Sequence, residues 1–309
     1  MSRTTCKTAP PLTSSPLCDI LRAGLVKEVR RVKRERVAED IYVFYSDAYA
    51  QAAAGIILIP EGAIVIDTLP FPEETAEILR FIESQGIPRT RFVINTHFHG
   101  DHTYGTYLFR GATVISHRAC REALVRWGEQ RLAEAKQQSQ ALQDVVVRLP
   151  DIVFDEEMHV HFGRRTLRLA HLPGHTADSI GVMIEGDRIL FSGDAVMPVP
   201  YIPWGNRDQL RKSLATVLTM KPEMIVQGHG DILLRGEVAD TVESSLKYLD
   251  NIESRVAEVV RRGGSEADLR KIDIEACGRS RIPLDGLVSQ LHQANLTAIY
   301  RQAKRRHAY

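Results

Sequence analysis

Cysteine is scarce in this sequence, and the few cysteines are scattered. Four occur in 309 residues, and no two form a Cys-x-x-Cys pair; they are Cys6, Cys18, Cys120 and Cys277. A disulfide-built scaffold needs closely patterned cysteines, and a thiolate metal site needs paired ones. The sequence therefore favours neither, and we expect a reducing, cytoplasmic setting.

The sequence also lacks a strong net charge, a long apolar run and a leader. Its formal net charge is +1, from 40 basic and 39 acidic residues, which gives no electrostatic case for nucleic acid or an anionic membrane as a partner. No apolar run reaches the length of a membrane span, and no apolar segment follows the N-terminus as in a signal peptide. We expect a globular protein that acts on a small-molecule substrate. Its one basic run, residues 27–36, is interpreted as a solvated surface strand or helix.

Histidine, by contrast, is concentrated in one stretch, residues 95–103, which reads Asn-Thr-His-Phe-His-Gly-Asp-His-Thr. Four residues in it carry metal-binding groups, since imidazole and carboxylate are natural ligands of divalent ions: His97, His99, Asp101 and His102. The first two are two positions apart, so an extended backbone points them the same way, and Gly100 then lets the chain turn. The pattern predicts a strand over residues 91–95 that ends in a loop with two ligand pairs, rather than a polar loop with chance histidines.

Three further polar residues follow apolar strands beside a glycine. They are His175 in Pro-Gly-His-Thr, Asp194 in Ser-Gly-Asp and His229 in Gly-His-Gly. A strand end holds a side chain rigidly, and glycine lets the backbone approach a ligand closely. Each signal alone is weak, but together with the histidine-rich stretch they predict the remaining ligands of a metal site.

The order of predicted elements places these motifs in one layered α/β unit. Two blocks of short strands are each followed by a helix, at residues 71–85 and 207–220, which predicts two packed sheets with helices outside. We divide the chain into an N-terminal extension, a catalytic domain and a C-terminal helical segment, over residues 1–36, 37–236 and 237–309. The helical segment has an apolar face that packs on the core or on a second subunit of a homodimer.

Over about residues 37–235, the chain resembles the metallo-β-lactamase superfamily, of the kind that includes glyoxalase II and lactonases. The resemblance implies a four-layer αββα sandwich, with a C-terminal helical appendage, that holds two metal ions where the sheets meet. It implies that the ligands of one ion are His97, His99 and His175. It implies that those of the other are Asp101, His102 and His229, with Asp194 as a bridge between the ions. Asp67, at the end of the strand over residues 63–66, would orient the histidine-rich loop without binding metal.

The expected cofactor is a pair of divalent ions, zinc first, with iron or manganese as alternatives, since nitrogen and oxygen ligands without thiolate suit all three. We hypothesise that a hydroxide bridging the ions attacks an electrophilic carbonyl or phosphorus, and that Asp101 orients it. One ion would polarise the oxygen under attack, and the other would stabilise the leaving group.

The substrate is predicted to be a carboxylic ester, lactone or thioester, because the apolar segment at residues 195–205 follows a ligand directly and suits a polyanion less well. Tyr201 and Trp204 would line the pocket or merely pack, and a C-terminal helix could lay His292 or Asn295 over it. β-Lactam hydrolysis and phosphodiester hydrolysis remain alternatives of the same fold. The resemblance counts against the first, because β-lactamases of this fold do not use an aspartate at the bridging position. A non-hydrolytic relative of the diiron oxidoreductases is a further alternative.

Overall fold

The central strands are covered on both faces, and the alternation of their side chains explains the layers. In the computed structural model, which describes residues 32–306, β3 (Ala53–Ile59) sends Ile57 and Ile59 into the core between two sheets. The alternate residues Ile56 and Leu58 join a separate core cluster with residues of α2 (Pro72–Ser84). Because successive side chains of a strand point to opposite faces, a wholly apolar run such as this one belongs to a strand buried on both sides.

Within residues 32–306 the strands form one sheet in the order β1-β2-β3-β4-β5-β6-β7 and another in the order β13-β12-β11-β10-β9-β8. The other strands of the first sheet are β1 (Lys33–Ala38), β2 (Ile41–Tyr45), β4 (Gly62–Ile66), β5 (Thr90–Ile94), β6 (Thr113–His117) and β7 (Ile152–Phe154). Those of the second are β8 (Glu157–Phe162), β9 (Arg165–His171), β10 (Ile180–Ile184), β11 (Ile189–Gly193), β12 (Met224–Gln227) and β13 (Leu233–Leu234). β3 and β4 form a hairpin in which Gly55 lies opposite Ile66.

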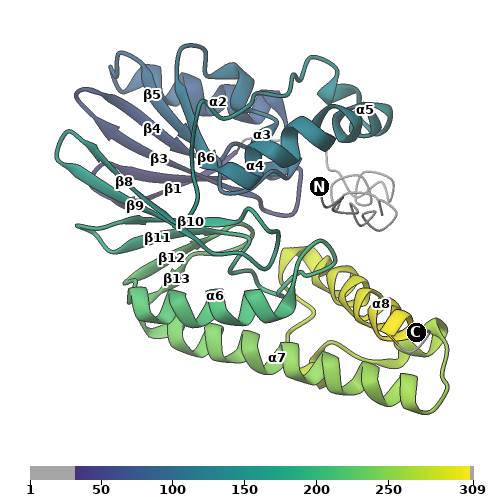
Figure 1. The fold of residues 1–309 in the computed structure, drawn as a ribbon. Helices are drawn as coiled ribbons and strands as arrows, with labels where there is room; N and C mark the ends of the chain where they lie inside the picture. Colours follow the sequence, from purple (N-terminus) through teal and green to yellow (C-terminus); the bar gives the residue numbers. More distant parts are fainter. Residues whose placement is uncertain (1–31, 307–309) are drawn as a thin grey trace, which may run out of the picture.

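Helices cover the outer faces of the two sheets (Figure 1). The longer ones besides α2 are α4 (Arg118–Ala123), α5 (Glu129–Gln138), α6 (Arg207–Met220), α7 (Arg235–Arg261) and α8 (Val288–Arg306). Shorter helical segments are α3 (Gly100–Thr103), η1 (Thr106–Leu108), η2 (Leu124–Gly128), η3 (Gln140–Leu142), η4 (Glu266–Lys271), η5 (Glu275–Cys277) and η6 (Leu284–Gly286). The predicted αββα arrangement with C-terminal helices is confirmed.

The C-terminal helices pack on the outer layer of the second sheet. Leu249, Ile252 and Val256 of α7 are fully buried in a core cluster shared with α6 and α8. The apolar face that suggested a homodimer is therefore covered within the chain, and a homodimer stays a prediction. Among the described residues, no helix has the length and apolar character to cross a membrane.

Two sequence predictions differ from the structure at element boundaries. The described part of the basic run lies in β1, an exposed edge strand paired with β2, so residues 33–36 belong to the first sheet rather than to an extension. The remainder of the predicted extension, residues 1–31, lies outside the described residues. Residues 104–109, where the sequence also predicts the start of a helix, contain only the single turn η1, which follows α3.

Candidate metal centre

The histidine-rich stretch is held in place from behind by Asp67, which follows β4. The carboxylate of Asp67 accepts hydrogen bonds from the backbone N–H of Thr96 at 2.7 Å and from its hydroxyl at 2.6 Å. Its Oδ2 also lies 3.0 Å from Nδ1 of His102. Asp67 thus joins the start and the end of the stretch, and its backbone takes a positive φ of 57° to do so.

The second half of the stretch is the one-turn helix α3 rather than the loop expected from sequence. It carries Asp101 and His102 in its first turn. Its position is fixed by hydrogen bonds to the carbonyl of His102, from the Asn95 side chain at 3.1 Å and from the Thr68 backbone N–H at 3.0 Å. The backbone of Ile180 in β10 also donates to the carbonyl of Thr96 at 2.9 Å, which ties the stretch to the second sheet.

Three strand ends of the second sheet bring the other predicted ligands to the same place. His175 lies in the loop after β9, Asp194 directly follows β11, and a single residue separates His229 from the end of β12. An isolated bridge pairs His229 with Ala52, the residue directly before β3 of the first sheet. The site therefore lies at the edge where the two sheets meet, and all seven candidates are buried.

Three imidazoles converge around one point. Nδ1 of His99 lies 3.0 Å from Nε2 of His97 and 3.0 Å from Nε2 of His175. Oδ2 of Asp194 is 3.2 Å from Nε2 of His175 and 3.7 Å from that of His97. Two ligand atoms each about 2.0–2.1 Å from one tetrahedral zinc ion are about 3.3 Å apart. These four side chains therefore have the spacing of a single metal site.

A second group converges beside the first and meets the other oxygen of Asp194. Nε2 of His102 and Nε2 of His229 lie 3.3 and 3.5 Å from Oδ1 of Asp194. Oδ2 of Asp101 lies 3.3 Å from Nε2 of His229. Asp101, His102 and His229 could hold a metal ion, and Asp194 presents one oxygen to each group.

Backbone carbonyls on the far side of His175 and His229 fix which ring nitrogen of each residue faces the centre. Nδ1 of His175 lies 2.9 Å from the carbonyl oxygen of Tyr201, and Nδ1 of His229 lies 3.0 Å from that of Ala50. A carbonyl oxygen only accepts, so both Nδ1 atoms carry hydrogen, and the Nε2 atom of each ring faces the centre. Such fixed tautomers are typical of metal-binding histidines.

The charge balance differs between the two groups. Burial, reinforced by the neighbouring imidazoles, lowers the pKa of His97 and His99 well below the ordinary value, so these rings are neutral. Burial also opposes the charged form of His229, but Asp194 and Asp101 outweigh it and raise its pKa to about 9. The second group therefore favours a positive charge among its carboxylates.

These observations fit bound cations. Among the described residues, Nε2 of His102 and Oδ1 of Asp194 are buried without a hydrogen-bond partner, although they lie only 3.3 Å apart. A ring nitrogen and a carboxylate oxygen this close repel unless a proton or a metal ion lies between them. Buried charges and polar atoms are otherwise paired or coordinate metals. The donor set of imidazole and carboxylate is one that divalent ions accept.

A family comparison agrees with this geometry. The model of the Metallo-beta-lactamase superfamily matches residues 50–229, more than half of the chain, and the match includes all seven candidates. The chain belongs to the metallo-beta-lactamase superfamily. The resemblance inferred from the motifs is thus confirmed.

Curated relatives in this superfamily include enzymes of thioester chemistry. The chain is 31% identical over 127 residues to acyl-coenzyme A thioesterase MBLAC2 of Bos taurus, covering 38% of this chain and 45% of that protein. It is 25% identical over 202 residues to the hydroxyacylglutathione hydrolase of Methylococcus capsulatus, covering 63% and 68%. Beta-lactamase-like protein 2 homolog of Drosophila melanogaster is 27% identical over 148 residues, covering 46% and 45%. The matched part thus spans less than half the length of the bovine and fly relatives.

A solved structure shows the shared superfamily fold. The metallo-beta-lactamase from Pontibacter korlensis superposes with a TM-score of 0.59 at 19% identity, over 70% of this chain and 99% of that one. The similarity at this level concerns the fold alone.

In this member of the superfamily, an apolar hollow adjoins the metal-ligand candidates. Besides those ligands it is lined by Tyr49, Ala50, Met197, Tyr201, Leu284, Leu287 and Leu291. The predicted wall residue Tyr201 is among them, whereas Trp204 and His292 are not. Trp204 instead packs against Arg131, whose guanidinium carbon lies 4.1 Å from the centre of its ring.

His292 does not lie over the hollow as the sequence suggested. It is buried in the C-terminal segment, with its ring nitrogens 2.9 Å from the Tyr248 hydroxyl and 3.0 Å from the Ile272 carbonyl. Sequence reasoning missed the three leucines of residues 284–291 that do reach the hollow. In the sequence they were marked only as apolar residues of the C-terminal helical segment.

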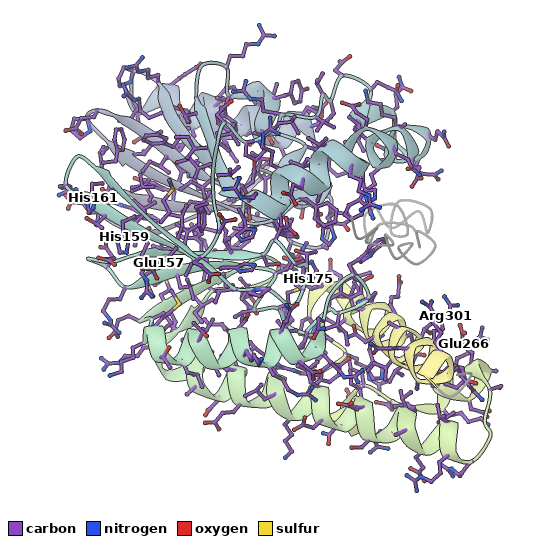
Figure 2. The ribbon with its side chains drawn as sticks, viewed as in Figure 1. Glu157, His159, His161, His175, Glu266 and Arg301 are labelled. Atoms are coloured by element: carbon purple, nitrogen blue, oxygen red, sulfur yellow. The ribbon has the colours of Figure 1, made fainter. Side chains whose placement is uncertain are left out.

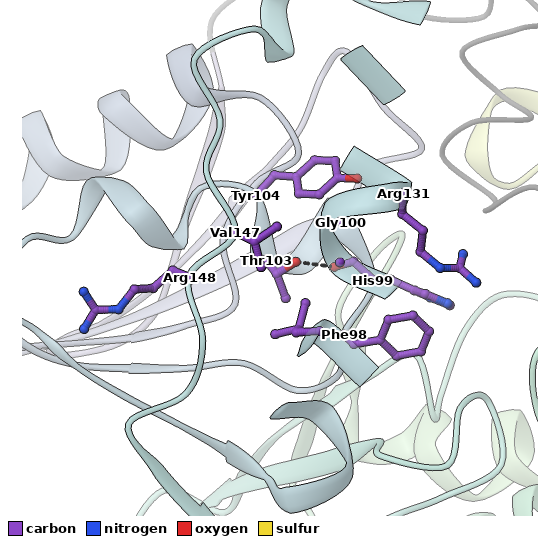
Figure 3. A pocket seen from close by; sticks show the side chains of 10 residues that line it. Phe98, His99, Gly100, Thr103, Tyr104, Arg131, Val147 and Arg148 are labelled. Carbon is purple, nitrogen blue, oxygen red and sulfur yellow. Dashed lines mark hydrogen bonds between the residues drawn. The ribbon is translucent and has the colours of Figure 1, made fainter. Parts of the chain in front are cut away.

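A second hollow lies on the other side of His99 and was not predicted (Figure 3). It is lined by Phe98, His99, Tyr104, Arg131 and Val147, among others, and the side chains of Arg131 and His99 extend in the same direction. Two further histidines, His159 and His161, lie on β8, far from His175 (Figure 2).

Proposed function

We propose that the chain is a metal-dependent hydrolase that binds two divalent ions, zinc first, and cleaves a carboxylic ester, lactone or thioester. The observation that carries this proposal is the position of Asp194, with one oxygen facing each of two ligand groups. A carboxylate can bridge two ions, whereas a single imidazole nitrogen cannot. Iron or manganese remains the alternative for the ions.

We assign His97, His99 and His175 to the first ion, and Asp101, His102 and His229 to the second, with Asp194 shared. Bound there, the ions supply Lewis acidity and lower the pKa of a water molecule toward neutrality. The chain fixes the tautomers of the rings through the carbonyls of Tyr201 and Ala50. Asp67 orients the histidine-rich stretch from behind.

Asp101 is the residue proposed to act on the water. Burial by itself would raise the pKa of this carboxyl, but His102 and His229 outweigh burial and hold it at about 2. Asp101 therefore stays ionised at neutral pH. An ionised carboxylate can accept a hydrogen bond from the attacking water and orient it toward the substrate carbonyl.

The lining of the hollow supports a substrate with an apolar acyl part. Met197 and the leucines of residues 284–291 offer apolar contact next to the ligands, and Tyr201 is proposed to donate a hydrogen bond to the substrate carbonyl. The thioesterase and hydroxyacylglutathione hydrolase among the relatives favour a thioester within this class. We also propose a cytoplasmic setting, which the buried, unbridged thiols of Cys120 and Cys277 support.

A substrate panel tests this proposal. Metal-loaded protein is assayed on an aliphatic acyl thioester, a lactone, a β-lactam and a bis-aryl phosphodiester, and the ions are counted by elemental analysis. We expect two zinc ions per chain and turnover of the thioester or lactone. Turnover of only the phosphodiester or only the β-lactam would refute the substrate class, and a chain that binds no metal would refute the whole proposal.

A further inference from the structure

A chain of buried hydrogen bonds runs from the C-terminal helices to the loop that follows Asp194. It starts at the backbone carbonyl of Ile272, which lies 3.0 Å from Nε2 of His292. Nδ1 of His292 lies 2.9 Å from the hydroxyl of Tyr248, and this hydroxyl accepts from the side-chain amide of Asn295 at 3.1 Å. The three side chains are all buried, so each bond forms away from water.

The donors and acceptors along this chain have only one consistent order. The carbonyl of Ile272 only accepts, so Nε2 of His292 carries the hydrogen and its Nδ1 is an acceptor. Burial lowers the pKa of His292, which keeps the ring neutral. The hydroxyl of Tyr248 must then donate to His292, which leaves its oxygen lone pairs for Asn295. Because every group is satisfied, the network holds Asn295 in a single orientation.

Asn295 uses its remaining groups on the backbone to either side of Tyr201. Its Oδ1 accepts from the N–H of Ile202 at 2.9 Å, and its Nδ2 donates to the carbonyl of Pro200 at 2.7 Å. One side chain therefore holds the peptide groups before and after Tyr201. The Tyr201 carbonyl between them is the group that lies 2.9 Å from Nδ1 of His175.

We infer that Asn295 is a positioning residue for the metal centre, which it reaches through the Tyr201 backbone and His175. The inference rests on the proposed function, because it assigns His175 to the first ion. It gives the C-terminal segment a role in setting the ligand geometry of the first group. His229 in the second group is held instead by the carbonyl of Ala50, in the turn between β2 and β3.

This role differs from a purely structural one in what it predicts. If Asn295 only fastened α8 to the core, its loss would lower stability and leave metal affinity intact. A matched comparison is available in the same helix. The hydroxyl of Tyr300 donates to the carbonyl of Gly264 at 2.8 Å, a partly buried bond that does not reach the loop after Asp194.

The experiment compares Asn295→Ala with Tyr300→Phe in the full chain, using Co²⁺ alone as the probe. Co²⁺ affinity is measured by competition with a chelator, the visible d–d spectrum reports ligand geometry, and thermal unfolding reports stability. Loss of a group that orients a metal-binding histidine typically costs 10–100-fold in metal affinity. We expect Asn295→Ala to weaken one of two Co²⁺ sites at least tenfold and to change the spectrum, whereas Tyr300→Phe lowers only the melting temperature.

Tyr248→Phe keeps the experiment decisive if Asn295→Ala does not fold. It removes the bond that supports Asn295 but leaves both loop bonds, so the same Co²⁺ site should weaken by a smaller factor. Unchanged Co²⁺ affinity and spectrum in the folded Asn295 or Tyr248 variant would overturn the inference. Failure of the wild-type chain to bind Co²⁺ at all would instead overturn the proposed function.

Discussion

The two sheets supply the candidate ligands in different ways. The first sheet gives its ligands from one short stretch, which is braced by the side chains of Asp67 and Asn95 at the ends of β4 and β5. The second sheet gives one ligand from each of three strand ends, and two of these depend on a backbone carbonyl elsewhere in the chain. The partner of His175 is 26 residues away and that of His229 is 179 residues away in sequence. The first half is thus braced by side chains at the strand ends of its own sheet, and the second by backbone carbonyls of loops.

The largest effect should come from Asp194, the one residue common to both groups. Asp194→Asn removes the charge that faces both groups while keeping the side-chain size, so we expect loss of both ions. Activity should fall on the order of 10³-fold, because several kcal/mol of transition-state stabilisation depend on the ions. Elemental analysis and turnover of the best panel substrate measure the two effects. Asp208→Asn, at an exposed carboxylate of α6, serves as the control, and retention of two ions by Asp194→Asn would contradict the shared role.

The next test separates the two groups. His97→Ala should remove the first ion and His229→Ala the second, so native mass spectrometry should find one ion in each variant. Since these ions act together on one substrate, both variants should lose most of their activity. The control is His159→Ala, which alters an exposed histidine on β8 and should keep two ions. If His97→Ala and His229→Ala each lost both ions, the centre would be one cooperative unit rather than two groups.

The contrast between the halves also explains what the sequence could predict. The candidate ligands could be predicted, because three histidines in six positions and a His or Asp beside a strand-end glycine are visible in a single chain. The two packed sheets were predicted from two blocks of short strands, each followed by a helix. The carbonyls of Tyr201 and Ala50 could not be found, since a backbone group has no residue-type signature and its role depends on which segments meet.

The features that were not predicted correctly also have physical explanations. The sequence allowed a C-terminal helix to place His292 over the pocket, but the helix turns it toward Tyr248 and Ile272. Edge strands such as β7 and β13 have two or three residues, too few for a two-residue period to be detected. β1 reads as a charged run because an edge strand of a sheet faces solvent and is protected by charge.

A smaller effect is expected at Gly228, where the backbone packs closely against Asp194. A Cβ atom at Gly228 would lie 1.9 Å from Oδ1 of Asp194, so Gly228→Ala must push this carboxylate away from its ligand position. We expect weaker binding of both ions and a loss of about 1–3 kcal/mol in the free energy of unfolding from overpacking. Zinc titration and urea unfolding measure these effects. Gly236→Ala in α7 meets nothing within 4 Å and should be neutral or slightly stabilising; equal behaviour of the two variants would contradict the packing argument.

The smallest effect on the reaction is expected at Glu74 of α2. Its effect on stability, by contrast, should depend on pH. The fully buried carboxyl of Glu74 accepts from the Ser46 hydroxyl at 2.9 Å and from the Ala48 backbone N–H at 3.4 Å. These residues begin the segment that carries Ala50, whose carbonyl holds His229. Burial raises the pKa of Glu74 from 4.5 to about 7, so the folded chain favours the protonated carboxyl. Its contribution to stability is then complete below pH 4.5 and declines as the pH rises to about 7, where it is lost.

Glu74→Gln removes this titration while keeping a neutral, hydrogen-bonding side chain. Urea unfolding of both proteins between pH 5 and 8 should show the wild type losing about 1–3 kcal/mol more than the variant across this range. Every other titrating group is common to the two proteins, so the difference between their profiles isolates Glu74. Parallel profiles would mean that Glu74 is ionised in the folded chain and that Ser46 and Ala48 stabilise its charge. The segment that orients His229 would then be anchored by a buried carboxylate, and the stability of this anchor would not change with pH in this range.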